Sequence, residues 1–318
     1  MSGRTRWVLT RVLLTVPTLL AMSVFVFALI HLVPGDPVRT MLGFRATPEN
    51  VRVIRHQLGL DRPLVSQYLS WLRGLLHGDL GQDYISHESL DQLLRERIPV
   101  TLELTIASMA LALLVGVPLG VIAASGRRAG RAATSVFTIA GISIPDFWLG
   151  TILILVFAAK LNWLPPTGYV KLTTSVVQNV RYMALPVLTL AVGEAAYILR
   201  TTRASMQETM ERPFVTFLRA KGLRRYAIVY KHALRTASLP IVTVAGIQFG
   251  VLLGGAIVVE TLFGLPGVGK LVVTAINQRN YTVVQGSVLV IAALFILVNL
   301  ATDLLYGLLN PRLGGEST

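Results

Sequence analysis

The sequence predicts an all-α integral membrane protein with six transmembrane helices and a helical extracytoplasmic insertion between the first two. Of its 318 residues, 53% are hydrophobic and 14% are charged, whereas soluble domains carry about 25% charged residues. The apolar residues also fall in runs close to the roughly 20 residues that a helix needs to cross a bilayer core of about 30 Å. A chain of this kind needs a bilayer as its solvent. The absence of cysteine excludes disulfides and thiolate metal sites.

The six expected spans follow from the apolar runs. They are Val12–Leu32, Val100–Ala124, Thr134–Ala159, Met183–Leu199, Ile241–Val259 and Val283–Leu309. The first run follows Arg4, Arg6 and Arg11, as the apolar part of a signal peptide would. It is longer than a signal peptide requires, and no small-residue cleavage site follows it, so we expect a retained helix.

The distribution of Lys and Arg predicts the orientation of these spans. Sixteen basic residues fall on one side, which holds the N-terminus, the turn 127–131, the segment 200–235 and Arg312. The short loops on the other side hold five. Because cytoplasmic loops carry the excess of Lys and Arg, both termini are expected in the cytoplasm, with the chain multi-pass in a bacterial inner membrane.

Segment 35–98 then lies outside and should be helical. Helices are expected over 48–59, 63–78 and 89–97, the last of them ending before Pro99. Thr47 is a suitable N-cap for a helix that opens with Pro48. Two interpretations of the segment remain open: a lid packed on the membrane helices, or a docking surface for an extracellular partner.

Glycines at intervals of four residues predict close helix packing. Gly246, Gly250 and Gly254 form such a stripe in the fifth span, and Gly116 and Gly120 repeat it in the second. Small residues let the backbones of membrane helices approach each other. This signal is structural and indicates no substrate.

The stretch Gly264–Lys270 fits the phosphate-loop pattern G-x-x-x-x-G-K. A nucleotide site also needs a preceding strand and a Ser or Thr after the lysine, where Leu271 stands. The topology places the stretch outside the cell, so we expect a turn followed by a short surface helix. No H-E-x-x-H or G-x-S-x-G set occurs either. We therefore expect no catalytic residue, cofactor or metal in this chain.

Two acidic residues fall near the middle of expected spans. Asp146 lies in the third span beside Pro145, and Glu194 lies in the fourth. Charged groups inside a membrane usually face a cavity or a partner. They are candidates for a translocation path that would attract the amino terminus of a peptide. Alternatively, each carboxylate satisfies polar groups of a neighbouring helix.

The segment between the fourth and fifth spans is strongly basic. From Phe214 to Pro240 it carries six Lys or Arg and no acid. Two short helices interrupted at Gly222 are expected, the first opening at Pro213 and the second ending where Pro240 marks entry to the next span. Such a loop could bind anionic lipid, or could dock on a soluble partner and transmit its motion.

These stretches resemble a known family. RAKGL (219–223) and KHALRTASLP (231–240) are similar to the cytoplasmic EAA-type loop of bacterial ABC importer permeases, closest to the dipeptide, oligopeptide and nickel branch. The same resemblance extends from about Arg11 to Leu313 through PGDP (34–37), LGLDRPLVSQYLSWL (58–72), GDLG (78–81), SIPDFWLG (143–150), WLPPTG (163–168) and ETLFGLPGVGKL (260–271). Leu218 and Thr236 depart from the residues that are common in the family, Ala and Asn.

The resemblance implies a division of the chain. Residues 1–34 would be the cytoplasmic tail and first span, and 35–98 the insertion. Residues 99–313 would be a type I importer core with a coupling loop at 203–240, and 314–318 a cytoplasmic tail. The residues implied in coupling to ATPases are Arg219, Ala220, Lys221, Gly222, Leu223, Arg224 and Arg225.

The resemblance also implies a function and partners. The chain would be one of two homologous permease subunits, docked on two ATPase subunits that hold ATP and Mg²⁺ and served by an extracytoplasmic solute-binding protein. Its cargo would be di- or oligopeptides; nickel or another small solute is the alternative within the family. The alternatives of other classes are a lipid-anchored membrane scaffold and an ion-coupled transporter.

Overall fold

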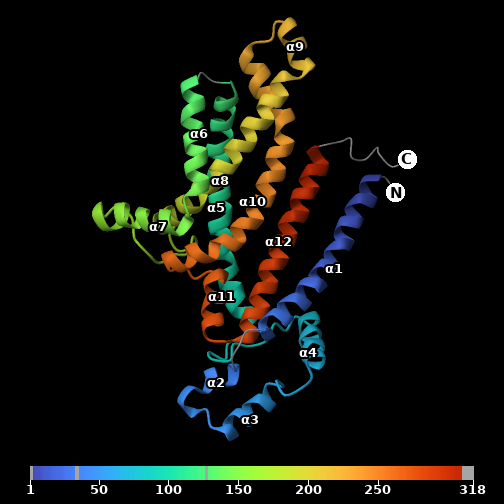
Figure 1. The fold of residues 1–318 in the computed structure, drawn as a ribbon, viewed down its shortest axis with the longest axis vertical. Helices are drawn as coiled ribbons and strands as arrows, with labels where there is room; N and C mark the ends of the chain where they lie inside the picture. Colours follow the sequence, from blue (N-terminus) through green and yellow to red (C-terminus); the bar gives the residue numbers. More distant parts are fainter. Residues whose placement is uncertain (1–2, 33–35, 126–127, 310–318) are drawn as a thin grey trace. The chain divides into compact units, whose positions relative to one another are not determined.

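The computed structural model describes residues 3–32, 36–125 and 128–309, and this part is almost entirely helical (Figure 1). Its α-helices are α1 (Gly3–Leu32), α2 (Pro37–Leu42), α3 (Pro48–Gln57), α4 (Leu64–Leu76), α5 (Leu90–Ser125), α6 (Arg128–Ser143), α7 (Asp146–Leu153), α8 (Val176–Glu211), α9 (Pro213–Ala220), α10 (Leu234–Phe263), α11 (Val268–Asn277) and α12 (Tyr281–Leu309). A 3₁₀ turn, η1 (Gly43–Arg45), and two π-helical segments, η2 (Ile154–Lys160) and η3 (Ala227–Ala233), complete them. Within the described ranges, extended pairing is limited to one bridge between Gln82 and Ser89.

The chain divides into two compact units. The first unit contains Met1–Leu9, Leu102–Leu265 and Leu297–Thr318, and the second contains Thr10–Thr101 and Pro266–Ile296. Three of the four boundaries lie inside α1, α5 and α12, so these long helices contribute to both units; the fourth lies between α10 and α11.

Helix α8 is the centre of the first unit, where it packs on α6, α7 and α10 (Figure 1). Glycines of neighbouring helices allow this close packing. A Cβ on Gly116 of α5 would lie 2.8 Å from the carbonyl oxygen of Ala195, and a Cβ on Gly120 would lie 2.9 Å from that of Leu199. The close approach predicted for Gly116 and Gly120 is therefore confirmed, and α8 is the partner helix.

The glycines of the α10 stripe differ in how closely other helices approach them. A Cβ on Gly246 would collide with Thr302 of α12, whereas a Cβ on Gly254 would have no neighbour within 4 Å. The predicted close packing is therefore confirmed at Gly246, while Gly254 makes no such contact among the described residues.

The structure does not confirm six spans. Four helices of the described part are long and apolar enough to cross a membrane: Leu90–Ser125, Val176–Glu211, Ala227–Phe263 and Tyr281–Leu304. The described part of the first expected span contributes a shorter apolar helix, Val12–Ala28.

The third expected span is broken. Its two halves, Ala132–Ser143 and Asp146–Lys160, are bent by 103° relative to each other and make a fifth span only if counted together. Pro145 lies at the bend. Proline cannot donate a backbone hydrogen bond and disfavours the helical conformation in the residue before it, which explains why one continuous helix does not form.

Two of the three helices expected in segment 35–98 are confirmed. Helix α3 begins at Pro48, and the Thr47 hydroxyl accepts a hydrogen bond from the Asn50 N–H at 3.3 Å. Helix α4 ends just before Gly78, which has a φ of +80°. Helix α2 was not predicted; it is capped by Asp36, whose carboxylate accepts the Val38 N–H at 3.0 Å.

The third expected helix, over 89–97, is wrong at its end. Helix α5 begins at Leu90 and continues through Pro99 to Ser125. Proline removes one helical hydrogen bond, but Leu94 and Val100 on either side are buried. Their packing compensates for the lost bond, and the expected boundary between residues 98 and 99 therefore lies within a helix.

The core of the second unit joins segments far apart in sequence. Leu90, Leu93 and Leu94 of α5 form one buried cluster with apolar residues of α11 and α12. The Asn280 amide also donates to the Asp83 carboxylate at 2.6 Å. Val268 and Leu271 are buried in this cluster, whereas Thr274, Ile276 and Asn277 are exposed, so α11 is a short surface helix that packs one face on the core of this unit.

Candidate functional site

The basic segment after α8 contains a helix break at Gly222. Helix α9 ends at Ala220, and Gly222 has a φ of +77°. The Gly222 N–H donates to the Arg219 carbonyl at 2.9 Å and the Leu223 N–H to the Leu218 carbonyl at 3.2 Å. These bonds satisfy the free carbonyls at the helix end in the way that a C-terminal glycine allows. The predicted interruption at Gly222 is therefore confirmed.

The second expected helix of this segment is longer than predicted. Residues Ala227–Phe263 form one helix, in which η3 leads directly into α10. Pro240 lies inside α10 and does not end it, because the buried residues Ala237 and Ile241 on either side hold the helix in place. The second half of the basic segment, from Ala227 onward, and the fifth expected span are thus one continuous helix.

The segment is firmly attached to the rest of the first unit. Val229 and Ala233 are buried against Val121 of α5 and Met206 of α8. The Arg225 guanidinium donates a 2.7 Å hydrogen bond to the carbonyl of Ser125, the last residue of α5. Movement of this segment would therefore pull on both α5 and α8.

The opposite face of the segment is open, and we call it the coupling surface, defined by Phe217, Arg219, Lys221, Arg224 and Tyr226. Phe217 is 58% exposed and Tyr226 73% exposed. The Lys221 ammonium lies 4.6 Å from the centre of the Phe217 ring, a cation–π distance. A Cβ on Gly222 would meet no atom within 4 Å. The surface therefore presents aromatic and cationic groups that this chain itself does not cover.

A hollow of about 440 Å³ adjoins the coupling surface. It is lined by Met210 of α8, Arg219, Leu223, Arg225 and Ile228. Its lining combines three apolar side chains with two arginines, of which Arg225 is already bonded to Ser125.

The candidate path residues Asp146 and Glu194 lie on adjacent helices. Glu194 is only 8% exposed and accepts a 3.1 Å hydrogen bond from the Gln248 amide of α10. Asp146 opens α7, and its Oδ1 lies 3.7 Å from the position that a Cβ on Gly193 would take. Its carboxylate has no hydrogen-bond partner among the described residues. Helices α7, α8 and α10 therefore bring two acids and one amide to the same region.

Gln248 was not among the residues predicted from the sequence. Its signal was present, because it is one of few polar residues in the apolar run Ile241–Val259. A polar side chain inside a span usually finds a hydrogen-bonding partner, and the partner here is Glu194.

Another acid of the first unit, Glu103, is fully used within the chain. Its two oxygens accept hydrogen bonds from the Asn179 amide at 2.6 Å and from the Tyr169 hydroxyl at 2.8 Å. Burial, followed by the bond to Glu103, raises the pKa of Tyr169 above its ordinary range. Glu103 thus ties α5 to the loop before α8 and holds its donors in place.

The phosphate-loop-like stretch Gly264–Lys270 likewise makes its contacts within the chain. Helix α10 precedes it, where a nucleotide site requires a strand. The Val268 N–H, at the start of α11, donates to the Thr101 hydroxyl at 2.9 Å. The backbone donor that a phosphate would need is therefore already bonded. Across the described residues, no group of three or more His, Asp or Glu could hold a metal ion.

Some sequence predictions fall outside the described residues. The side chains of Arg4, Arg6, Arg11 and the turn 127–131 are not described, and neither are residues 310–318. The contributions of these groups to orientation stay predictions.

Family models match nearly the whole chain. Residues 116–315 match the binding-protein-dependent transport system inner membrane component, and residues 4–105 match the N-terminal membrane component of such systems. Together with the helical fold, these matches place both the insertion and the core in one family.

Curated relatives agree over nearly the full length. A chain of Brucella abortus (strain 2308) named as a peptide transport system permease protein is 38% identical over 310 residues, covering 97% of this chain and 98% of the relative. The dipeptide transport system permease protein DppB of Escherichia coli (strain K12) is 39% identical over 333 aligned residues, with the same coverage.

The fold is also similar to a solved structure. An inward-facing form of the MetNI methionine ABC transporter matches with a TM-score of 0.57 at 21% identity, covering 69% of this chain and 97% of that one. The chain therefore belongs to the family of binding-protein-dependent transport system inner membrane components, and it is a multi-pass permease subunit of the inner membrane, a role that is not catalytic in this family.

Proposed function

We propose that this chain is one of two membrane subunits of an ATP-driven importer that carries di- or oligopeptides inward. The cargo assignment rests on the names of its relatives, which are peptide and dipeptide permeases. Within the same family, nickel or another small solute is the alternative cargo.

The coupling surface is the observation that carries this proposal. Its aromatic and basic groups face away from the chain, although aromatic and arginine side chains are the ones that most often anchor protein interfaces. We assign this surface to docking on a separate ATPase subunit, which would hold ATP and Mg²⁺. Residues Arg219–Arg225 would form the centre of the contact, with Gly222 allowing close approach of the partner's backbone.

Helix α8 supports a mechanical link between this surface and the cargo. Met206 packs under the coupling segment, and Glu194 lies twelve residues earlier on the same uninterrupted helix. At 1.5 Å per residue, the two positions are about 18 Å apart along the axis. Displacement of the coupling segment when ATP closes the ATPase pair would therefore move the part of α8 that carries Glu194.

Asp146 and Glu194 are assigned to the translocation path. A peptide carries a positive amino terminus, and a carboxylate in a membrane interior attracts such a group strongly because water screens it little. Asp146 is the better candidate for direct contact, since its carboxylate has no hydrogen-bond partner among the described residues.

The remaining partners and the topology complete the proposal. A homologous permease subunit would form the other half of the path, and an extracytoplasmic solute-binding protein would deliver cargo. Both termini and the loop 203–240 would be cytoplasmic, with residues 35–98 outside. We place the domain limits at 34, 98 and 313, as the resemblance implies.

Reconstituted transport tests the proposal. The complex, purified with the partners that accompany this chain, should import a labelled dipeptide into proteoliposomes only when ATP is supplied, and a proton ionophore should leave uptake unchanged. Uptake without ATP, or uptake abolished by the ionophore, would favour an ion-coupled transporter. A chain that co-purifies with no ATPase and binds anionic vesicles through Arg224 and Arg225 would favour the lipid-anchored scaffold.

A further inference from the structure

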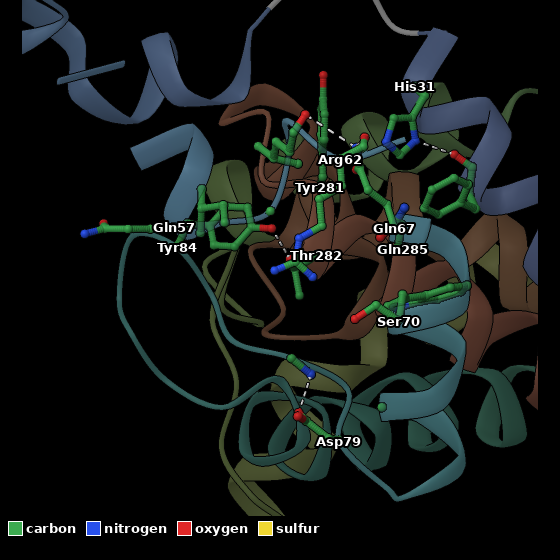
Figure 2. A pocket seen from close by; sticks show the side chains of 17 residues that line it. His31, Gln57, Arg62, Gln67, Ser70, Asp79, Tyr84, Tyr281, Thr282 and Gln285 are labelled. Atoms are coloured by element: carbon green, nitrogen blue, oxygen red, sulfur yellow. Dashed lines mark hydrogen bonds between the residues drawn. The ribbon is translucent and has the colours of Figure 1, made fainter. Parts of the chain in front are cut away.

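A pocket of about 330 Å³ lies in the second unit (Figure 2). None of its lining residues belongs to the coupling surface or to the proposed translocation path. This volume is at the lower end of the range for small-molecule sites, roughly 300–1,000 Å³. The pocket is formed by α1, the end of α3 with its following loop, α4, residues 79–84 and the start of α12. Two of the stretches that identify the family, 58–72 and 78–81, contribute many of its lining residues.

Packed aromatic rings fix one wall of the pocket. The Phe27 ring lies 4.3 Å from His31, 5.4 Å from Tyr68 and 6.2 Å from Trp71, measured between ring centres. The Tyr68 hydroxyl is also hydrogen-bonded to Ser23 at 2.9 Å. The positions of Trp71 and His31 are therefore set by packing before any ligand arrives.

Two buried polar atoms of this wall lack a partner within the described part of the chain: Trp71 Nε1 and His31 Nε2. The indole nitrogen can only donate. The other ring nitrogen of His31, Nδ1, lies 2.8 Å from the carbonyl oxygen of Phe27, so Nδ1 carries the hydrogen. In the neutral ring Nε2 is then an acceptor. The wall thus offers one donor and one acceptor that the protein leaves unused, although buried polar groups are normally hydrogen-bonded.

The pocket also contains a cation, Arg62, whose charge acts on the neighbouring Asp61 but which forms no salt bridge with it. The Arg62 side chain reaches into the middle of the pocket (Figure 2) and forms no ion pair within the described ranges. The acidic side chain next to it in sequence, Asp61, is paired with His56 at 2.6 Å. Asp79, the acid in the pocket lining, lies at the far end in Figure 2 and accepts the Gly81 N–H at 2.9 Å.

An amide adds both kinds of hydrogen bond. Gln285 of α12 lines the pocket, is only 6% exposed, and has no hydrogen-bond partner among the residues described. A buried amide offers two donors and one acceptor. The groups that line this pocket therefore match a ligand with a negative group and a hydrogen-bond donor.

We propose that this pocket binds a small α-amino acid or a molecule of the same zwitterionic chemistry. Its carboxylate is held by the Arg62 guanidinium and the Trp71 indole N–H, and its amino group donates to His31 Nε2. The Gln285 amide forms a hydrogen bond with the carboxylate or the amino group of the ligand. Charge-assisted bonds from a guanidinium are the strongest of these contacts, so Arg62 contributes most of the affinity.

The test is isothermal titration calorimetry on the full transporter complex in lipid nanodiscs. L-leucine is the probe, L-leucinamide lacks its carboxylate, and 4-methylpentanoate lacks its amino group. We expect saturable binding of L-leucine, and binding of each analogue weaker by at least about tenfold, which is about 1.4 kcal/mol.

Four variants locate the binding in this pocket. Arg62→Gln and Trp71→Phe should each weaken L-leucine binding by about tenfold. Arg52→Gln removes an exposed arginine outside the pocket and Trp163→Phe an exposed tryptophan of the first unit, and both should bind as the unchanged protein does. Each variant is first shown to assemble by size-exclusion chromatography.

Several results would overturn the proposal. They are the absence of saturable L-leucine binding, equal binding of L-leucinamide, or L-leucine binding that Arg62→Gln leaves intact. If no small ligand binds and Arg62→Gln instead weakens association of the solute-binding protein, Arg62 receives an acidic side chain of that protein and the proposal is wrong.

Discussion

Gly222 and Gly264 end helices with the same backbone geometry, at φ of +77° and +67°, but they lie in opposite surroundings. A Cβ on Gly222 would meet nothing within 4 Å, and aromatic and basic side chains around it are exposed. The turn at Gly264 leads into α11, whose first N–H is bonded to Thr101 and whose apolar face is buried. The Gly264 turn matches a nucleotide-binding pattern and is closed, while the Gly222 turn matches none and is open.

The comparison of Glu103 with Asp146 shows the same difference between acids. Both oxygens of Glu103 receive donors from this chain, whereas Asp146 has no hydrogen-bond partner within the described ranges. The groups that the fold satisfies internally hold it together, and those that it leaves free are the ones available to partners and cargo. Variants in open regions should therefore impair transport, and variants in closed regions should impair stability.

Gly222→Val should have the largest effect. Valine is branched at Cβ and disfavours positive φ, so the turn that presents the coupling surface would be distorted. ATP-driven uptake should fall by more than tenfold while the subunit still inserts, measured by transport in proteoliposomes and by membrane yield.

Two matched variants sharpen this prediction. Gly78→Val imposes the same strain after α4, where a Cβ also meets nothing, and should leave uptake unchanged. Gly222→Asn should retain most of the uptake, because asparagine tolerates positive φ. Full uptake in Gly222→Val would remove the coupling role from this turn.

Replacing the two acids that we propose for the translocation path should have the next largest effect. Asp146→Asn and Glu194→Gln remove charge at nearly constant volume, and dipeptide uptake should fall about tenfold if these groups meet the cargo's amine. Assembly and ATP hydrolysis without cargo should stay normal. Normal uptake in both variants would make them structural, and lost assembly would assign them to helix packing.

Truncating the exposed rings of the coupling surface should weaken the ATPase contact moderately. Phe217→Ala and Tyr226→Ala should each reduce the affinity for the ATPase subunit by about tenfold, as central interface aromatics do when truncated. Phe44→Ala, which removes an exposed ring of the second unit, is the control. Equal effects of all three in a pull-down titration would show that general hydrophobicity, and not this surface, determines binding.

The smallest effect is expected in a closed region. Tyr169→Phe removes one donor to Glu103 and should lower the free energy of unfolding by about 1 kcal/mol, with uptake unchanged at temperatures where the protein is folded. Because the pKa of Tyr169 is raised above its ordinary value of about 10, the neutral hydroxyl is favoured in the folded state. The stabilisation by the neutral Tyr169 hydroxyl is complete at pH values below the ordinary pKa of tyrosine. It is lost as the pH rises through the raised pKa of the folded state.

That loss can be measured by thermal unfolding in detergent. As the pH is raised from 8, the difference in the free energy of unfolding between the unchanged protein and Tyr169→Phe should shrink as the hydroxyl ionises. A difference that is constant across this range would show that Tyr169 does not act through its hydroxyl proton.

Local chemistry predicted the elements whose limits depend on a few neighbouring residues. The Thr47 cap, the glycine ends at Gly78 and Gly222, and the close packing at Gly116 and Gly120 all follow from short-range rules. Prolines were less reliable as predictors of helix ends. Pro145 lies at a sharp bend, but Pro99 and Pro240 lie inside continuous helices, because the buried side chains around them outweigh one lost hydrogen bond.

The candidate sites could be predicted only in part. Asp146, Glu194 and the basic segment are visible as charges that interrupt or follow apolar runs. The pairing of Glu194 with Gln248 joins residues 54 positions apart. The pocket at Arg62 likewise combines α1 with α12. No periodicity along the chain reports such contacts, so they required the structure.

Accessibility of a single cysteine tests the account most directly, because the chain has none of its own. Lys221→Cys places a thiol on the coupling surface, and Gln82→Cys places an exposed reference thiol in the expected outer segment. A membrane-impermeant maleimide should label Gln82→Cys but not Lys221→Cys in spheroplasts. In inside-out vesicles it should label Lys221→Cys, and added ATPase subunits should suppress that labelling. Labelling of Lys221→Cys in spheroplasts, or labelling that the ATPase subunits leave unchanged, would contradict a cytoplasmic docking surface around Gly222.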